Sequence, residues 1–362
     1  MQQSIVSLIV FFYIFVGVAL LAFNLMYMAG SSRRGRAFGR MVEAEMAFQM
    51  RMAIDRSGSD DVNDDRKYRR KLFRQLTREE CLLTFDSALE RNLKKEPPGT
   101  FDGYLRRYHD VISDAAMYYC RRPAMERALF SHLVSILPAT VAMEYRRLGE
   151  LLLTYLEDST IYCRENVLQA LYKLGNDDAL ERALRLFQEK GWYHSSKLLA
   201  DGMIQFNGDR EALARRLWAG KWDDGMRAVL IQFMNNLPAD LSELVMPELS
   251  SRHEEVRFAA IRYFARHVRE EAAPAIREIA GQGDDTAAAA ARALGSYPGR
   301  ESKEVLVKAL TSGNWYVRRN AAESLMEMDL TEEDVRMLSH HDDKYAREMF
   351  VYVLESREKK RC

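Results

Sequence analysis

Apolar residues recur at helical spacing along most of the chain, and one short pattern returns at regular intervals. Val256–Phe264 reads VRFAAIRYF, Val317–Leu325 reads VRRNAAESL, and Thr286–Leu294 begins halfway between them. Apolar residues at i, i+3, i+4 and i+7 predict amphipathic helices with one buried face. Runs of alternating β-branched residues are missing after residue 30, so we expect an all-α fold.

Seven segments share this pattern, and their starts lie 29–32 residues apart. They begin at Cys163, Ser195, Met226, Val256, Thr286, Val317 and Ala346. Acidic turns such as Asp223-Asp224 precede them and suit the N-termini of helices. Turn formers such as Asn207-Gly208 follow and lead into a second helix. A hairpin of about thirty residues cannot bury its apolar faces alone, so the repetition predicts a stacked solenoid.

The repeated pattern resembles the HEAT repeat family in its short bacterial form. Its residues are an acidic turn, a Val-Arg pair and an Ala pair, found at Val256-Arg257 with Ala259-Ala260 and at Val317-Arg318 with Ala321-Ala322. Arg164, Arg227 and Arg347 hold the arginine position in three further repeats, whereas Ser196 and Ala287 replace it in two. The resemblance covers roughly residues 140–358 and implies a right-handed α-solenoid of helical hairpins, with second helices on the concave side. It implies little about function, because one fold serves many functions.

The first thirty residues predict a membrane anchor. Ile5–Ala29 contains no charged residue and is long enough to cross a bilayer as a helix. Arg33, Arg34, Arg36 and Arg40 follow this segment, and no basic residue precedes it. The positive-inside rule then predicts a single-pass protein with its N-terminus outside and the rest cytoplasmic. The resemblance to the bacterial form of the repeats implies that the membrane is the bacterial inner membrane. A cleaved secretory signal is the alternative, although its basic residues would precede a shorter apolar core.

The basic residues after the anchor have two interpretations. Arg33, Arg34, Arg36 and Arg40 contact anionic lipid headgroups at the membrane surface, or they serve only as the orientation signal.

The division of the chain into segments follows from its composition. We expect a transmembrane anchor in 1–30, a basic juxtamembrane helix and polar linker in 31–66, an irregular helical cap in 67–155 and the repeat solenoid in 156–358.

Within the cap region, Lys67–Leu93 predicts one long amphipathic helix. Further helical stretches are expected at Tyr104–Tyr119, Ala124–Leu137 and Tyr145–Glu157. These helices are either degenerate repeats or a capping bundle, since the terminal units of solenoids are atypical.

Composition and motifs argue against several function classes. Lys+Arg and Asp+Glu both number 53, and a dedicated nucleic-acid binder would show a basic excess. The four cysteines are widely spaced, which favours packed, reduced thiols over disulfides or zinc. The seven histidines show no metal-binding spacing, and the His253-Glu254 pair has no counterpart in neighbouring repeats. We expect no catalytic residue, no metal and no cofactor.

Two groups of residues are candidates for a protein interface. Aromatic residues recur where one repeat passes to the next, at Trp192, Tyr193, Trp222, Trp315 and Tyr316. They are either exposed anchors for a partner or packing residues between repeats. Basic residues lie on predicted second helices, at Arg182, Arg185, Arg215 and Arg216. Acidic residues share these helices, so the basic group is either an anion-binding patch or a solvated face of mixed charge.

These features favour a membrane-tethered scaffold that binds a membrane-associated protein, as part of a membrane enzyme complex. The alternative is an enzyme of the HEAT-like lyase or DNA glycosylase type, acting in the concave groove. Such an enzyme requires a pocket with convergent polar residues. A purely structural spacer is the third possibility.

Overall fold

The computed structural model describes residues 34–54, 62–282 and 285–361, and the chain divides into two compact units, Met1–Asn176 and Asp177–Cys362. No strand occurs in these described ranges, which confirms the all-α expectation. The predicted anchor, Ile5–Ala29, and Arg33 lie outside the described residues. Among the described helices, no single one is both long enough and apolar enough to span a membrane. Ala124–Ser135 and Ala139–Tyr145 reach that length and apolarity only when they are taken together, and a bend of 108° separates them.

The second unit alternates first and second helices, and the six predicted repeat segments from Ser195 onward are its first helices, whereas the segment that starts at Cys163 belongs to the first unit. The first helices are α11 (Ser196–Ile204), α13 (Asp224–Asn235), α15 (Glu254–Arg266), α17 (Asp285–Ala293), α19 (Trp315–Leu325) and α21 (Lys344–Arg361). The second helices are α10 (Asp177–Lys190), α12 (Arg210–Trp218), α14 (Ser242–Val245) with η2 (Met246–Ser250), η3 (Glu270–Ala272) with α16 (Ala273–Ala280), α18 (Arg300–Ala309) and α20 (Glu332–Ser339); η4 (Leu294–Ser296) extends α17. From α11 to α21, each first helix packs on the next, and second helices pack on the following first helix.

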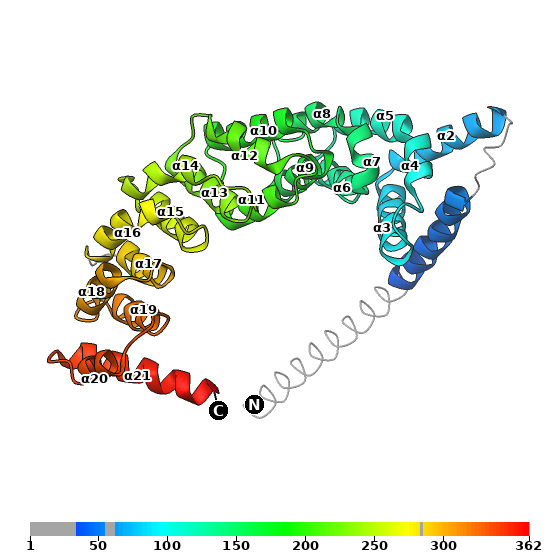
Figure 1. The fold of residues 1–362 in the computed structure, drawn as a ribbon. Helices are drawn as coiled ribbons and strands as arrows, with labels where there is room; N and C mark the ends of the chain where they lie inside the picture. Colours follow the sequence, from blue (N-terminus) through cyan, green and yellow to red (C-terminus); the bar gives the residue numbers. More distant parts are fainter. Residues whose placement is uncertain (1–33, 55–61, 283–284, 362) are drawn as a thin grey trace, which may run out of the picture. The chain divides into compact units, whose positions relative to one another are not determined.

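Within this second unit the first helices line the inner side of the curve, and the second helices line its outer side (Figure 1). The expectation that second helices form the concave side is therefore wrong for this unit. The reason lies in the contacts between first helices. Every first helix from α11 to α21 packs directly on the next, so this side of the stack is closely packed along its whole length.

The first unit shows the same two-row packing with longer hairpins. Its helices are residues 34–54, α2 (Val62–Leu76), α3 (Glu79–Lys95), α4 (Asp102–Arg107), α5 (His109–Tyr119), α6 (Ala124–Ser135), α7 (Ala139–Ala142), η1 (Met143–Tyr145), α8 (Leu148–Thr154) and α9 (Ile161–Leu174). One row runs from α3 through α6 to α9, and the other runs from α2 through α5 to α8. Buried tyrosines join successive hairpins: the hydroxyls of Tyr119, Tyr145 and Tyr155 donate to backbone carbonyls about forty residues earlier.

The single helix expected over Lys67–Leu93 is wrong, because the chain turns at Thr77-Arg78 between α2 and α3. Thr77 Oγ1 donates to the carbonyl of Phe73 at 2.8 Å, and Tyr119 Oη donates to the carbonyl of Leu76 at 2.6 Å. Side chains thus satisfy carbonyls at the end of α2, and Arg78 adopts an extended conformation. The Tyr119 contact comes from a helix distant in sequence, so the helical period alone gave no sign of this break.

Candidate protein interface

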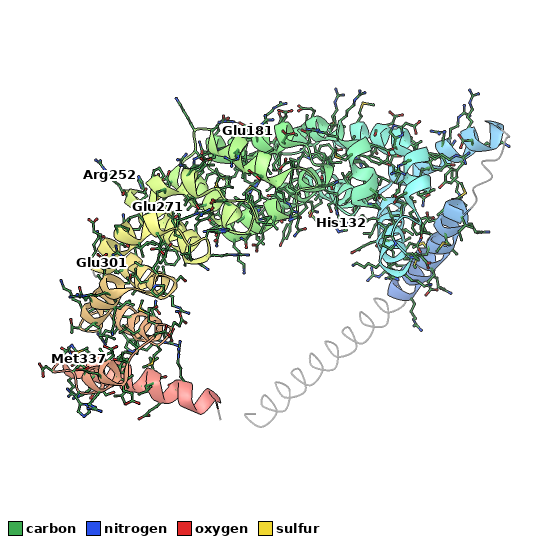
Figure 2. The ribbon with its side chains drawn as sticks, in the orientation of Figure 1. His132, Glu181, Arg252, Glu271, Glu301 and Met337 are labelled. Carbon is green, nitrogen blue, oxygen red and sulfur yellow. The ribbon has the colours of Figure 1, made fainter. Side chains whose placement is uncertain are left out.

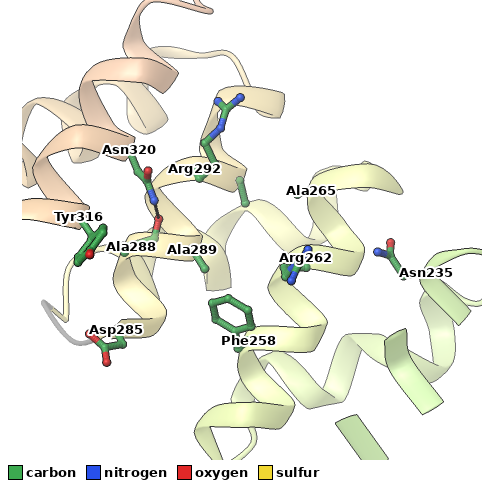
Figure 3. A pocket seen from close by; sticks show the side chains of 11 residues that line it. Asn235, Phe258, Arg262, Ala265, Asp285, Ala288, Ala289, Arg292, Tyr316 and Asn320 are labelled. Carbon is green, nitrogen blue, oxygen red and sulfur yellow. Dashed lines mark hydrogen bonds between the residues drawn. The ribbon is translucent and has the colours of Figure 1, made fainter. Parts of the chain in front are cut away.

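A groove of about 590 Å³ opens on the inner face of the second unit, lined by α15, α17 and α19 and by Asn235 at the end of α13 (Figure 3). Phe258 and Arg262 of α15 form one wall, and Tyr316 of α19 stands at the opposite side. Ala288 and Ala289 of α17 form the floor between them. Phe258 and Tyr316 are both exposed, with 40% and 65% of their surface accessible, so the groove presents aromatic surface to solvent.

The hollow arises because α17 is built from alanines. Aligning the repeats on Val256, Thr286 and Val317 places Ala288 at the register of Phe258 and Arg319. The middle helix therefore carries a methyl group where its neighbours carry large side chains. Asn320 Nδ2 donates to the carbonyl of Ala288 at 2.7 Å and holds α19 against this floor.

Charges at the groove differ in their pairing. Arg292 binds Glu327 through two hydrogen bonds of 2.6 and 2.7 Å, and this contact holds the pKa of the Glu327 carboxyl below its ordinary value. Arg262 lies over the Phe258 ring, 5.7 Å from its centroid, and forms no ion pair with any residue in the described ranges. The guanidinium of Arg262 is therefore available to a carboxylate from outside the chain.

A second cavity of about 360 Å³ adjoins the groove and shares Phe258 and Asp285 with it. Its other lining residues include Gln232 of α13 and the acidic pair Glu254-Glu255 at the start of α15. Phe258 thus stands between a side with an accessible cation and an acidic side. A partner that contacts both cavities therefore meets a positive side chain on one side of Phe258 and acidic side chains on the other.

The predicted aromatic residues fall into two groups. Tyr193, Trp315 and Tyr316 are exposed, and Tyr316 also lines the groove. Trp192 is half-buried, with its ring 5.6 Å edge-on from the Phe187 ring. Trp222 is also half-buried: its Nε1 donates to the carbonyl of Leu217, and the Arg185 guanidinium lies 4.8 Å over its ring. The packing interpretation therefore fits Trp222, and the interface interpretation fits Trp315 and Tyr316.

The predicted basic residues lie on α10 and α12, in the outer row of the second unit, away from the groove. Figure 2 labels Glu181, Glu271, Glu301 and Met337 on this outer row. Arg216 binds Asp177, Asp178 and Glu181, and Arg185 also binds Glu181. Arg215 binds Glu211 and Glu243, and Arg182 is exposed on α10. Carboxylates thus surround this basic group, which fits a face of mixed charge.

Sequence reasoning missed Phe258, Arg262 and Asn320. The sequence pattern could have identified Phe258 as an exposed aromatic residue. It lies between Val256 and Ala259, at a position that the helical period directs away from the buried face. An aromatic residue there is exposed unless another segment covers it. Of the predicted membrane-surface arginines, Arg34, Arg36 and Arg40 are exposed in the first turns of helix 34–54.

A family model described as HEAT repeats matches residues 282–355. The match spans α17 to most of α21 and includes Val317-Arg318 and Ala321-Ala322, so the resemblance is confirmed for this part of the chain. No curated protein matches the sequence.

Across the described ranges, no three His, Cys, Asp or Glu side chains form a group able to hold a metal ion.

Proposed function

We propose that the chain is a scaffold that binds a partner protein through the inner face of its second unit. HEAT repeats support protein binding in general. The observation that carries the proposal is the groove itself, where exposed Phe258 and Tyr316 flank an alanine floor beside Arg262. Aromatic and arginine side chains dominate the binding energy of protein interfaces. We expect the partner to insert an apolar side chain between the aromatic residues and to place a carboxylate on Arg262.

We also propose that Ile5–Ala29 tethers the scaffold to the bacterial inner membrane and leaves the repeats in the cytoplasm. The support is the uncharged length of this segment and the basic residues that follow it. A tether confines the inner face to the membrane surface and raises its effective concentration for a partner there. A membrane enzyme complex is the partner class that this arrangement favours.

Site-specific photocrosslinking in native membranes tests the partner site. A photoreactive residue replaces Tyr316 in the full-length protein, and a matched variant carries it at Met337, which is 51% exposed on the outer row. We expect one dominant protein adduct at position 316, none of the same mass at 337, and its loss when Phe258→Ala is added. Equal adducts at both positions, or an adduct at 316 that survives Phe258→Ala, would contradict the proposed site.

Alkaline extraction tests the tether separately. The full-length protein should stay with the membrane pellet at high pH, and a variant lacking residues 5–29 should move to the supernatant. Release of the full-length protein under these conditions would reject the tether while leaving the groove proposal intact.

A further inference from the structure

A separate cavity of about 590 Å³ lies in the first unit, between helix 34–54, α2 and α3. Its lining combines apolar and cationic side chains. The apolar side chains are Met41, Ala44 and Phe48, and the cationic ones are Arg51, Lys71, Arg74 and Arg78. Every charged residue from Arg66 to Arg78 is basic, and the acidic pairs Asp64-Asp65 and Glu79-Glu80 flank this run.

The four cations of this pocket outnumber the one carboxylate among its described lining residues. Within the described part of the chain, none of Arg51, Lys71, Arg74 and Arg78 forms an ion pair. On the same helix α2, by contrast, Arg69 binds both Asp65 and Asp110. Among the described lining residues the one acidic side chain is Glu45, which accepts a hydrogen bond from Gln49.

An aromatic ring holds two of these cations at the cavity. Lys71 Nζ lies 4.6 Å from the centroid of the Phe48 ring, and the Arg51 guanidinium lies 5.9 Å from it. Cation–π contacts orient a charged group without cancelling its charge. Positive groups are thus placed around an apolar surface, an arrangement that suits a ligand with an anionic group next to an apolar one.

The pocket is preformed because buried polar contacts fix helix 34–54 on α3. Asn92 Nδ2 donates to the carbonyl of Met46 and to Gln49 Oε1, each at 3.2 Å. Gln49 Nε2 donates to the carbonyl of Phe85, also at 3.2 Å. Gln49 and Asn92 are buried, so these bonds set both the position and the rotation of the helix that carries Phe48 and Arg51.

We propose that this pocket binds the phosphate of an amphipathic phosphate ester. Arg51, Lys71 and the arginines of α2 and the turn after it bind the phosphate oxygens, since guanidinium groups match phosphate geometry. Phe48 and Met41 contact the apolar part of the ligand. The phosphate comes either from an anionic phospholipid headgroup, which helix 34–54 meets directly after the predicted anchor, or from a soluble phosphate compound. The inference does not depend on the groove of the second unit.

Calorimetric titration of the full-length protein in neutral detergent separates the two sources. The probes are short-chain phosphatidylglycerol, the zwitterionic short-chain phosphatidylcholine and inorganic phosphate. Saturable binding of phosphatidylglycerol at least tenfold tighter than of the other two supports the lipid source. Comparable binding of inorganic phosphate supports the soluble source. Absence of saturable binding by both phosphatidylglycerol and inorganic phosphate overturns the proposal.

Charge-removing variants show whether the binding belongs to this pocket. Each basic group near an anionic ligand contributes roughly a fivefold change in affinity, so Lys71→Gln with Arg74→Gln should weaken binding roughly 25-fold. Arg66→Gln with Arg70→Gln is the matched control that removes the same charge, because both residues are exposed on α2 but do not line the cavity. Equal losses of affinity in both variants would show that general charge attraction accounts for the binding, and would overturn the proposal that the ligand binds in this pocket. Unchanged thermal unfolding and unchanged crosslinking at position 316 confirm that the Lys71→Gln with Arg74→Gln variant is folded and that the two sites are independent.

Discussion

Arg318 donates from Nη1 to the backbone carbonyl of Ser312 at 2.6 Å, and so closes the turn before its own helix. A second bond from the same atom reaches the carbonyl of Gly313 at 3.1 Å. Arg257 and Arg347 make the equivalent bond to Ser251 and His341. In these three repeats the arginine at this position is therefore a structural residue that ties the turn to the following helix, whereas Arg227 binds Glu248 instead.

Replacing this arginine should destabilise the second unit. Arg318→Ala removes charge-assisted hydrogen bonds to two turn carbonyls, so we expect a loss of about 2 kcal/mol in the free energy of unfolding. Arg319→Ala is the control, because Arg319 makes an exposed ion pair with Glu323 and should change stability by less than about 0.5 kcal/mol. Urea unfolding followed by circular dichroism measures both. Equal effects would show that the turn contact is not stabilising.

The buried hydroxyl of Tyr297 gives a second stability prediction. Tyr297 Oη donates to the carbonyl of Phe264 at 2.8 Å and accepts from the backbone N–H of Arg269 at 3.4 Å. Tyr297→Phe leaves both backbone groups without this partner, and we expect a loss of about 1–2 kcal/mol. Tyr345→Phe serves as the control because the Tyr345 side chain is exposed, and its thermal unfolding midpoint should match that of the parent protein. An unchanged midpoint for Tyr297→Phe would count against the role of this hydroxyl.

His132 should make the stability of the first unit depend on pH. His132, which Figure 2 labels, has its Nδ1 3.1 Å from the buried carboxyl of Asp86. This hydrogen bond raises the pKa of His132 above its ordinary value of 6.5. Burial opposes the shift, Glu90 adds to it and Lys94 reduces it. The protonated imidazole therefore stabilises the fold fully below pH 6.5, and this contribution is lost as the pH rises through the raised pKa.

His132→Gln tests this dependence, since glutamine hydrogen-bonds but does not titrate. The thermal midpoint of the parent protein should exceed that of the variant most at about pH 6, and the difference should shrink steadily towards about pH 9. A difference that stays constant across this range, or that grows with pH, would exclude protonation of His132 as its source.

Filling the groove should block the proposed partner without removing any contact. Ala289 is half-buried on the floor, and Ala289→Phe places a ring between the two aromatic walls. We expect the crosslink from position 316 to fall at least tenfold while the unfolding midpoint changes little. Met337→Phe on the outer row is the control and should leave the crosslink unchanged. Undiminished crosslinking in Ala289→Phe would place the partner elsewhere.

Local sequence patterns were sufficient to predict the repeats. Thr160, Asp209, Asp223 and Asn314 cap the first or second helices through their side chains, as acidic and polar turns predict. These contacts join residues two or three positions apart, and so they can be read from one segment. The break at Thr77 was missed because part of its cause, Tyr119, lies 43 residues from Leu76 in the chain.

The sequence by itself determined the all-α class and the period of the repeats, because helical spacing and capping are local properties. Only the tertiary structure decided which row of the second unit lies inside, which charges are neutralised and where a groove remains open. Arg216 meets its carboxylates 35–39 residues away, whereas Arg262 meets none among the described residues. Such differences arise from packing between helices, and the sequence of one helix does not show which side chains its neighbours place against it.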